Sequence, residues 1–313
     1  MKRVLFHRRF LGYSGGHGKV RDYVRHVDAH PGFSAETWLT PDSIAAENPW
    51  EGTGLRRAEH WQPADADVLF LAGLDWQAVP DDRPGRPVLN LLQGLGHADA
   101  GDARRAFLRR PAVRVCVSQA VADAVLATGG VNGPVHVIPA AHDLPVLADV
   151  PSRPTAAPRI VIAGGKAPDL AAAVCAALDD VAGGVELLPA GLPRSGFLAH
   201  LAGADIAVLL PHDREGFFLP GLEAMALGAA VVMPDAGGNR QYLRSGINAL
   251  VPARDAGALA AAVRQLFDPA RRREIAAAGL ATAADHTLES ERAAFHALLD
   301  RLDAEWARCR HDS

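Results

Sequence analysis

Two glutamates flank the segment with the clearest chemistry in the sequence, Glu215-Gly-Phe-Phe-Leu-Pro-Gly-Leu-Glu223. An apolar run over residues 205–211 precedes it, and Pro220 and Gly228 are placed as in the first turn and just past the end of a short helix. The unpaired N–H groups and positive dipole end of a helix start favour an anion such as a diphosphate. Carboxylates accept hydrogen bonds from sugar and ribose hydroxyls. The segment therefore predicts a site for a diphosphate that carries hydroxyl-rich groups.

Two glycine loops are expected at the same edge of the protein. The loop 164–166 follows an apolar run at 159–163, and the loop 235–239 follows another at 230–234. Ligands of open parallel sheets bind beyond the carboxyl ends of the strands, and glycine lets the backbone approach a ligand closely. Lys166 is one of only three lysines in the chain, and its ammonium would neutralise charge that builds on a leaving diphosphate.

Each of these features has an ordinary explanation when it stands alone. A glutamate in a first helical turn usually complements the helix dipole, and glycines after strands are common in turns. Only their combination favours a ligand site. A glycosidase is disfavoured, because its two carboxyl groups must face each other across a bond, whereas Glu215 and Glu223 flank a helix start. The spacing of His, Asp and Glu indicates no metal site.

The elements that position these residues alternate between short apolar runs and helical segments, which is typical of parallel sheets with crossover helices. A chain of 313 residues suits two such domains. The proline-rich segment 148–158 is interpreted as the linker between them. Strands are expected at 3–7, 35–39, 68–71, 88–92, 113–118, 135–139, 159–163, 185–189, 205–211 and 230–234, with an edge strand at 249–252.

Helices are expected between the strands and at the end of the chain. Ser118 and Asp255 are predicted as N-caps, and Glu223 is placed in the first turn of its helix. The expected helices span residues 17–30, 119–128, 168–179, 195–202, 222–227, 256–267 and 288–306.

The composition narrows the class of protein. Hydrophobic residues make up 49%, charged residues 22%, and the net charge of −4 argues against a nucleic-acid binder. The three cysteines stand far apart, which favours reduced thiols in the cytosol over a disulfide framework. The basic segment 104–110 leaves a peripheral membrane contact open, although a solvated arginine face is the simpler interpretation.

The second half of the chain resembles the family-4 retaining glycosyltransferases (glycosyltransferases group 1), whose α/β fold, GT-B, has two Rossmann-like domains with parallel sheets facing across a cleft. Their signature is Glu, Gly-Phe-Gly-Leu-Pro and a second Glu, then Ala-Met-Ala-x-Gly, which here reads Glu215-Gly-Phe-Phe-Leu-Pro-Gly-Leu-Glu223-Ala-Met-Ala-Leu-Gly228. The segments 245–252, 113–118 and 137–143 resemble further family landmarks. Phe218 departs from the usual glycine, and Lys166 stands where relatives have a pair of basic residues.

The resemblance implies a metal-independent, retaining transfer of a sugar from a nucleoside-diphosphate sugar to a glycan, lipid-linked sugar or small-molecule acceptor, with no cofactor. It implies an acceptor domain at 1–150, a donor domain at 151–285 and a C-terminal helix at 286–313 that packs back on the first domain. Glu215 is the expected catalytic residue. Gln93 occupies the position of a family histidine, so His97 nearby is the second catalytic candidate. The donor-binding candidates are Gly15, Gly16, Lys166, Gly216, Phe217, Phe218, Leu219, Glu223, Gly238 and Asn239.

Two other functions are compatible with these residues. A nucleotide-sugar 2-epimerase of the same fold would act on the donor without an acceptor. A non-catalytic sugar-nucleotide-binding subunit would need no complete set of basic phosphate ligands, which suits the missing basic pair. The donor sugar, the nucleotide, the acceptor and the oligomeric state are not specified by the sequence.

Overall fold

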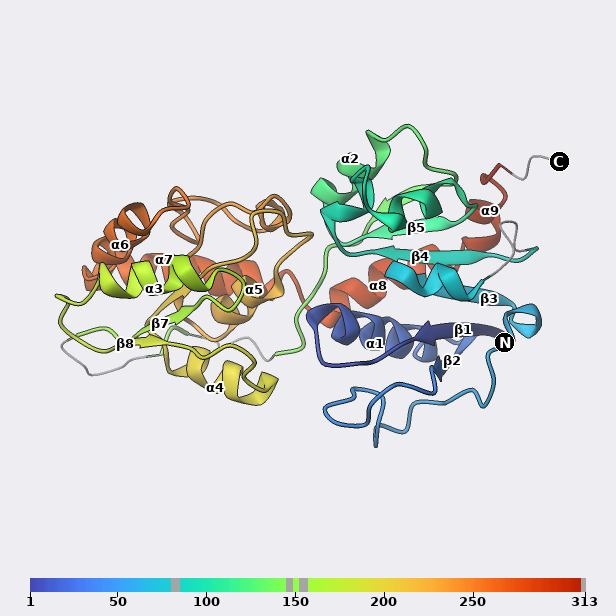
Figure 1. Ribbon diagram of the computed structural model, residues 1–313, viewed down its shortest axis with the longest axis horizontal. Coiled ribbons are helices and arrows are strands. Elements are labelled where there is room, and N and C mark those ends of the chain that lie inside the picture. Colours follow the sequence, from blue (N-terminus) through green and yellow to red (C-terminus); the bar gives the residue numbers. More distant parts are fainter. Residues whose placement is uncertain (80–84, 145–148, 152–156, 311–313) are drawn as a thin grey trace. The chain divides into compact units, whose positions relative to one another are not determined.

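The computed structural model describes residues 1–79, 85–144, 149–151 and 157–310. The chain forms two compact units (Figure 1), of which unit 1 comprises Met1–Ala140 with Leu288–Ser313, and unit 2 comprises Ala141–Thr287. The segment 148–158 that we interpreted as a linker lies largely outside the described residues.

Unit 1 contains a six-stranded parallel sheet in the order β2-β1-β3-β4-β5-β6. The central strands β3, β4 and β5 are buried along their whole length, as expected of a parallel sheet that is covered on both faces. The strands are β1 (Lys2–Arg8), β2 (Phe33–Leu39), β3 (Val68–Ala72), β4 (Val88–Leu92), β5 (Val113–Cys116) and β6 (Val135–Val137).

The helices of unit 1 include the expected ones and several short 3-10 turns. Ser118 caps α2 as predicted, its hydroxyl accepting a hydrogen bond from Val121 N at 3.2 Å. The helical elements are α1 (Gly15–Asp28), η1 (Pro63–Asp65), η2 (Gly73–Ala78), η3 (Leu95–Ala98), η4 (Ala103–Arg109), α2 (Gln119–Leu126), α8 (Leu288–Leu299) and α9 (Leu302–Trp306).

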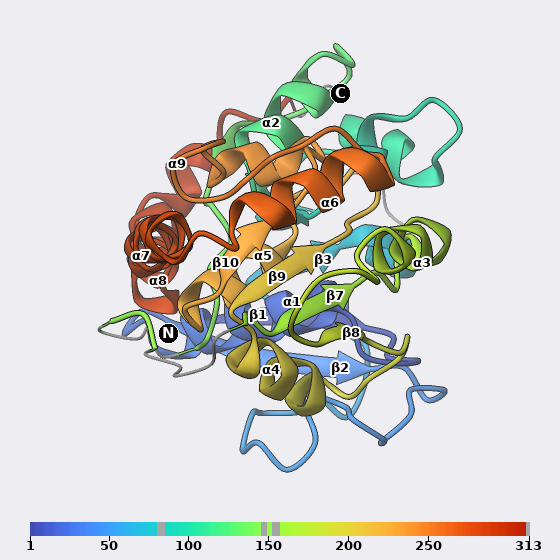
Figure 2. The same ribbon diagram turned by 90° about the vertical axis from the view of Figure 1, so that its left-hand side faces the viewer.

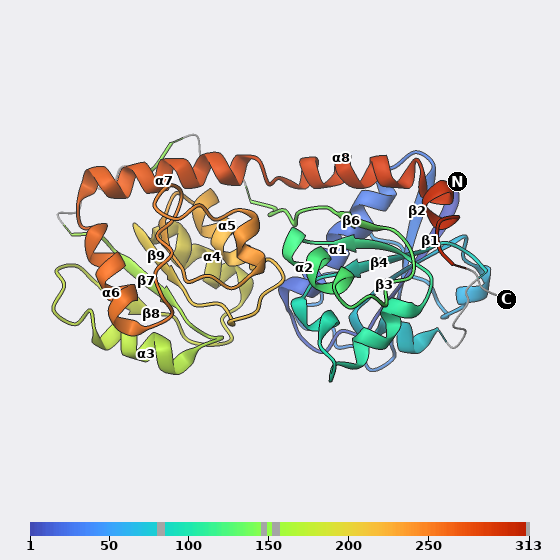
Figure 3. The same cartoon turned by 90° about the horizontal axis from the view of Figure 1, so that it is seen from above.

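The C-terminal helix differs from the single helix that the sequence predicted. It is broken at residues 300–301 into α8 and α9. No glycine or proline marks the break, so periodicity alone cannot reveal it; in the structure Asp300 leaves the helix and bonds His30 at 3.0 Å. Figure 3 shows α8 lying along α1.

A buried charged cluster joins α8 to α1. Lys19 Nζ lies 2.9 Å from Glu291 Oε2 and 3.0 Å from Asp22 Oδ2, and His26 Nε2 lies 3.0 Å from Glu291 Oε2. All four side chains are buried. Because a buried charge is tolerated only next to a partner, this cluster holds the last helices in unit 1.

Unit 2 contains a four-stranded parallel sheet in the order β10-β9-β7-β8, which Figure 2 shows side by side. The expected edge strand at 249–252 is wrong: Leu250 forms a single bridge to Val232, and Pro252 has no N–H with which to extend it. The strands are β7 (Ile160–Ala163), β8 (Val185–Leu187), β9 (Ile206–Leu209) and β10 (Ala230–Val232).

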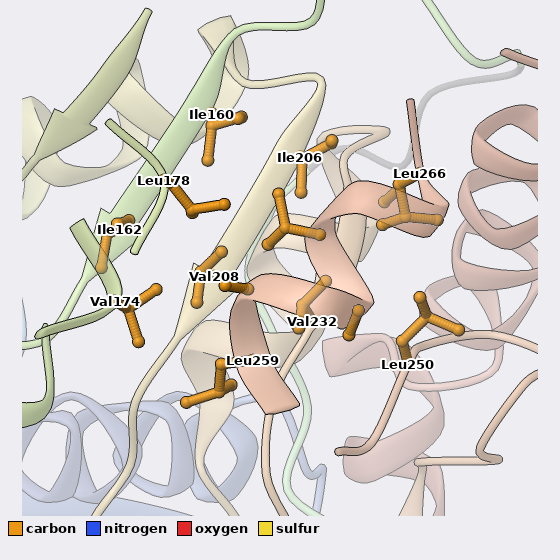
Figure 4. Close-up of a cluster of buried hydrophobic side chains, with 14 of the residues drawn as sticks. Ile160, Ile162, Val174, Leu178, Ile206, Val208, Val232, Leu250, Leu259 and Leu266 are labelled. Atoms are coloured by element: carbon orange, nitrogen blue, oxygen red, sulfur yellow. The ribbon is translucent and has the colours of Figure 1, made fainter. Parts of the chain in front are cut away.

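The helices of unit 2 pack on this sheet around an aliphatic core (Figure 4). Asp255 caps α6 as predicted, accepting a hydrogen bond from Ala258 N at 2.8 Å. One long helix, α7, was not predicted. The helical elements are α3 (Pro168–Ala176), α4 (Arg194–Gly203), α5 (Leu219–Ala226), η5 (Gly238–Gln241), α6 (Ala256–Gln265) and α7 (Pro269–Ala284).

Candidate functional site

The start of α5 forms the centre of the candidate site, beyond the carboxyl end of β9. The helix begins at Leu219, three residues earlier than the sequence suggested, with Pro220 in its first turn. Phe218 is its N-cap residue and has left-handed backbone angles, φ 69° and ψ 72°. Because α5 begins early, Glu223 lies in the second turn, which corrects the prediction of a first-turn position.

Glu215 and Lys166 meet in front of this helix start. Lys166 Nζ lies 2.6 Å from Glu215 Oε1, which also accepts a hydrogen bond from His212 N at 3.0 Å. The ammonium is 5.3 Å from the centre of the Phe218 ring, within the range of a cation–π interaction. The loops after β7 and β9 therefore bring together three residues that the sequence proposed separately.

Glu223 is paired with an arginine that the sequence did not indicate. Its side chain is 2% exposed, and Oε1 accepts a hydrogen bond from Arg194 Nη1 at 2.6 Å. Arg194 Nη2 donates to Asp143 Oδ1, also at 2.6 Å. Arg194 begins α4, 29 residues before Glu223, and no local motif distinguishes it from the many other arginines of the chain.

The loop 236–239 is hydrogen-bonded to the backbone of Glu215. Gly238 N donates to Glu215 O at 2.9 Å, and Glu215 N donates to Ala236 O at 2.8 Å. A Cβ at Gly238 would clash with the Gly216 backbone, so only glycine fits there. Asn239 is fully buried and bonds Ala236 N and Pro234 O. The Asn239 side chain thus bonds within its own loop, and its contact with the donor stays a prediction.

Two buried aromatic residues support the start of α5. Phe217 is buried against Tyr242, at 5.1 Å between ring centres. The Tyr242 hydroxyl donates to Phe218 O at 2.6 Å and so supports the left-handed N-cap. Burial, together with Glu215 and Glu223, raises the pKa of Tyr242 well above its usual value, so the phenol stays a donor. Phe217 and Tyr242 hold the loop, and no sequence motif indicated the role of Tyr242.

The Gly15-Gly16 loop of unit 1 lies at the carboxyl end of β1 and opens α1. Ser14 caps the helix, accepting a hydrogen bond from His17 N at 3.4 Å. Gln93, just after β4, donates to Gly16 O at 3.3 Å. The two strand ends therefore place a glycine loop and an amide side chain side by side, an arrangement that suits polar groups of a ligand.

His97 lies inside unit 1. It is 4% exposed in η3, and burial followed by the Arg104 charge lowers its pKa to about 4. His97 thus lies in a buried 3-10 turn and not in an exposed loop, whereas Gln93 contacts the backbone of Gly16. His17, half-buried beside Arg8 at 3.3 Å, also has its pKa lowered to about 4, first by burial and then by that arginine.

Metal sites and membrane-spanning helices are both absent from the part of the chain that the structure describes. Within the described residues, no three His, Cys, Asp or Glu side chains are grouped so that they could hold a metal ion. In the same part of the chain, no helix combines the length and the hydrophobicity that crossing a membrane requires.

Known structures identify the fold as GT-B. Alr3699/HepE of Anabaena in complex with UDP-glucose superimposes with a TM-score of 0.74 and 15% identity, covering 96% of this chain and 100% of that one. Sucrose-phosphate synthase from Thermosynechococcus elongatus gives a TM-score of 0.72 at 15% identity, covering 97% and 100%. The two parallel sheets in an α/β chain therefore form a GT-B protein, as the sequence predicted.

The family is indicated by the sequence comparisons. Residues 119–268 match the family model of the glycosyl transferases group 1. A D-inositol 3-phosphate glycosyltransferase of Geodermatophilus obscurus is 37% identical over 111 residues, which are 34% of this chain and 24% of that protein. The matched stretch thus spans about a quarter of this relative. The chain contains a group 1 glycosyltransferase region, and the predicted resemblance to that group is confirmed.

Proposed function

We propose that the protein is a retaining glycosyltransferase that uses a nucleoside-diphosphate sugar. The observation that carries the proposal is the start of α5, where Glu215 and Glu223 flank an anion-binding helix end and each is paired with a cation. The group 1 match supports it, and so do the solved complexes of Alr3699/HepE with UDP, glucose and UDP-glucose.

In the proposed complex, the backbone N–H groups of Phe218 and Leu219 donate to the diphosphate, and Glu223 accepts hydrogen bonds from the ribose. Glu215 positions the hydroxyls of the donor sugar. Lys166 exchanges part of its contact with Glu215 for the β-phosphate, where an ammonium stabilises the charge of the leaving group. The helix end and Lys166 supply this stabilisation in our proposal without a metal ion.

The proposed reaction proceeds with retention. The bond between the anomeric carbon and the phosphate oxygen breaks, and its electron pair stays on the phosphate. The acceptor oxygen bonds to the anomeric carbon on the same face, and its proton passes to the phosphate oxygen. Catalysis then depends on positioning and on charge stabilisation along the breaking bond. In unit 1 we propose Gln93, in place of His97, as the polar group next to the Gly15-Gly16 loop that meets a substrate.

The first test is a thermal-shift panel with UDP, ADP, GDP and their common sugar conjugates, since a ligand that binds only the folded state raises the melting temperature. The conjugate with the largest shift is then incubated with glycan, lipid-linked and small-molecule acceptors, and the anomeric configuration of the product is read by NMR. No shift with any nucleotide refutes the proposal. An epimerised donor formed without acceptor, or binding without turnover, replaces it with an epimerase or a binding subunit.

We also propose a peripheral contact with the inner face of the cytoplasmic membrane through the basic segment 104–110. Arg104 pairs with Asp102, and Arg110 lies over Trp76 at 4.6 Å from the ring centre. Arg105 and Arg109 have no carboxylate partner within the described residues, and they line a cavity of about 290 Å³ between η4 and the end of α2. Co-sedimentation with phosphatidylglycerol vesicles, lost in R105Q/R109Q, tests this contact.

A further inference from the structure

The two glutamates of the site have matching but separate cation partners. Lys166, from the loop after β7, reaches Glu215 at 2.6 Å, and Arg194, at the start of α4, reaches Glu223 at 2.6 Å. Lys166 is 46% exposed and free to exchange its contact, whereas the Arg194 side chain is 30% exposed and held by two carboxylates. The cations therefore differ in mobility, which indicates different tasks.

The contact between Arg194 and its two carboxylates requires an arginine. One guanidinium nitrogen bonds Glu223 and the other bonds Asp143, both at 2.6 Å. The planar guanidinium presents its donors in a fixed fork, whereas the ammonium of lysine is a single point charge on a flexible stem. Arg194 therefore fixes the direction of the Glu223 carboxylate as well as its charge environment.

The fixed direction of the Glu223 carboxylate matters because the side chain is buried. The carboxylate is 2% exposed on α5, and a buried carboxylate without a cation costs much more than an exposed one. Rotation of the carboxylate would break the 2.6 Å contact between its Oε1 and Arg194. Asp143 in turn limits the movement of Arg194, so the three residues act as one bridge between the beginning of unit 2, α4 and α5.

We propose that Arg194 is a positioning residue for the nucleoside end of the donor: it orients Glu223 toward the ribose hydroxyls, and Asp143 orients Arg194. This inference rests on the proposed function, because Glu223 has a ribose to hold only if the site binds a nucleoside diphosphate. A purely structural role predicts a loss of stability in Arg194 variants with no effect on how the site distinguishes one ribose from another.

The experiment compares UDP, ADP and GDP with their 2′,3′-dideoxy counterparts by isothermal titration calorimetry. The wild-type protein should prefer the ribose form of its best nucleotide by about tenfold or more, the usual worth of charge-assisted hydrogen bonds. R194Q should bind that nucleotide about tenfold more weakly and reduce its preference for the ribose form to within about threefold, because the misoriented Glu223 carboxylate no longer accepts hydrogen bonds from the ribose hydroxyls. R194K should recover part of the affinity and little of the preference.

Two further variants complete the test. R159Q removes an exposed arginine of the same unit that pairs with Glu186 at 2.7 Å, and it should leave the affinity and the ribose preference unchanged. D143N keeps Arg194 next to Glu223 and serves where R194Q does not fold; a several-fold loss of ribose preference is expected. A full wild-type preference in R194Q, or in D143N where R194Q is unfolded, overturns the role of Arg194. Failure of the wild-type protein to bind any of the nucleotides overturns both this inference and the proposed function.

Discussion

Phe218 offers a prediction in which the sign of the effect is decisive. Its backbone is left-handed, with φ 69°, a conformation that costs a residue with a side chain about 1 kcal/mol or more relative to glycine. At ordinary helical positions the order is reversed, and glycine is about 0.5–1 kcal/mol less stable than alanine. Both F218G and F218A lack the ring, so the difference in their stability reports mainly the preference of the backbone for glycine at a left-handed position. F218G should therefore be the more stable of the two by about 1 kcal/mol.

Both variants should be less stable than the wild type. Phe218 as a whole residue is 9% exposed, and truncating a buried phenylalanine costs about 3–5 kcal/mol. Loss of the contact with Lys166 adds about 0.5–1 kcal/mol. In F218G, relief of the left-handed strain offsets about 1 kcal/mol of this loss.

The assay uses the uneven distribution of tryptophan. The five tryptophans, at positions 38, 50, 61, 76 and 306, all belong to unit 1. Urea unfolding followed by far-UV circular dichroism reports both units, and tryptophan fluorescence reports unit 1 alone. The urea midpoint of unit 2 should be about 0.5 M higher for F218G than for F218A, and the fluorescence transition should not move.

A control at an ordinary helical position shows that the assay can detect the opposite sign. Ala261 is exposed within α6, so A261G should lower the midpoint of unit 2. If F218A equals or exceeds F218G in stability while A261G behaves normally, the α5 N-cap is not left-handed and our account of the helix start fails.

The other predictions concern turnover, a buried ion pair and pH. E215Q should lower turnover at least about a hundredfold while nucleotide affinity changes by less than about threefold, since Glu215 faces the reacting sugar in our proposal. Steady-state kinetics measure the turnover and calorimetry measures the affinity; unchanged turnover contradicts the proposal. K19M leaves the charges of Glu291 and Asp22 buried and should destabilise unit 1 by about 3–5 kcal/mol in fluorescence-monitored unfolding. K19M/E291L removes one of these two charges and should recover part of that loss; a change below about 1 kcal/mol for K19M refutes the burial argument. Because the pKa of His97 is lowered to about 4, the unfolded chain binds more protons than the folded one between about pH 6.5 and 4. The free energy of unfolding of unit 1 should therefore fall by up to about 3 kcal/mol as the pH falls through that window. H97Q should lose less stability, and parallel pH profiles of the two proteins would show that His97 does not titrate this way.

The strands were predictable because each is a short apolar run bounded by turn residues. The GT-B fold was predicted through the resemblance of the motif 215–228 to the group 1 glycosyltransferases, because this motif specifies a strand end, a helix start and a following strand together. The prediction of helices failed where the buried face of a helix consists largely of small residues. In α7 the buried positions are Ile275, Ala276, Gly279, Leu280 and Ala283, and alanine and glycine produce almost no hydrophobic periodicity.

The missed parts of the site depend on contacts between distant positions. Arg194 and Tyr242 reach the start of α5 from elements 29 residues before Glu223 and 24 residues after Phe218. The earlier start of α5 could not be predicted either, because Phe218 provides no capping side chain and occupies a conformation that sequence patterns assign to glycine. The internal bonds of Asn239 were equally hidden: its position after a strand suggested a ligand contact, and the sequence did not indicate that its amide bonds its own loop.

The return of α8 to unit 1 has a consequence for how the chain is made. Unit 2 is one continuous stretch, whereas unit 1 is assembled from both sides of it. During synthesis, residues 1–140 emerge before Glu291, so Lys19 lacks this counter-charge until α8 has left the ribosome. All residues of unit 2 are present once Thr287 has emerged, whereas unit 1 still lacks α8 and α9 at that point. The order of translation and the order of folding are thus opposite, and the first half of the chain is the part most exposed to chaperones and proteases while it waits for its last helices.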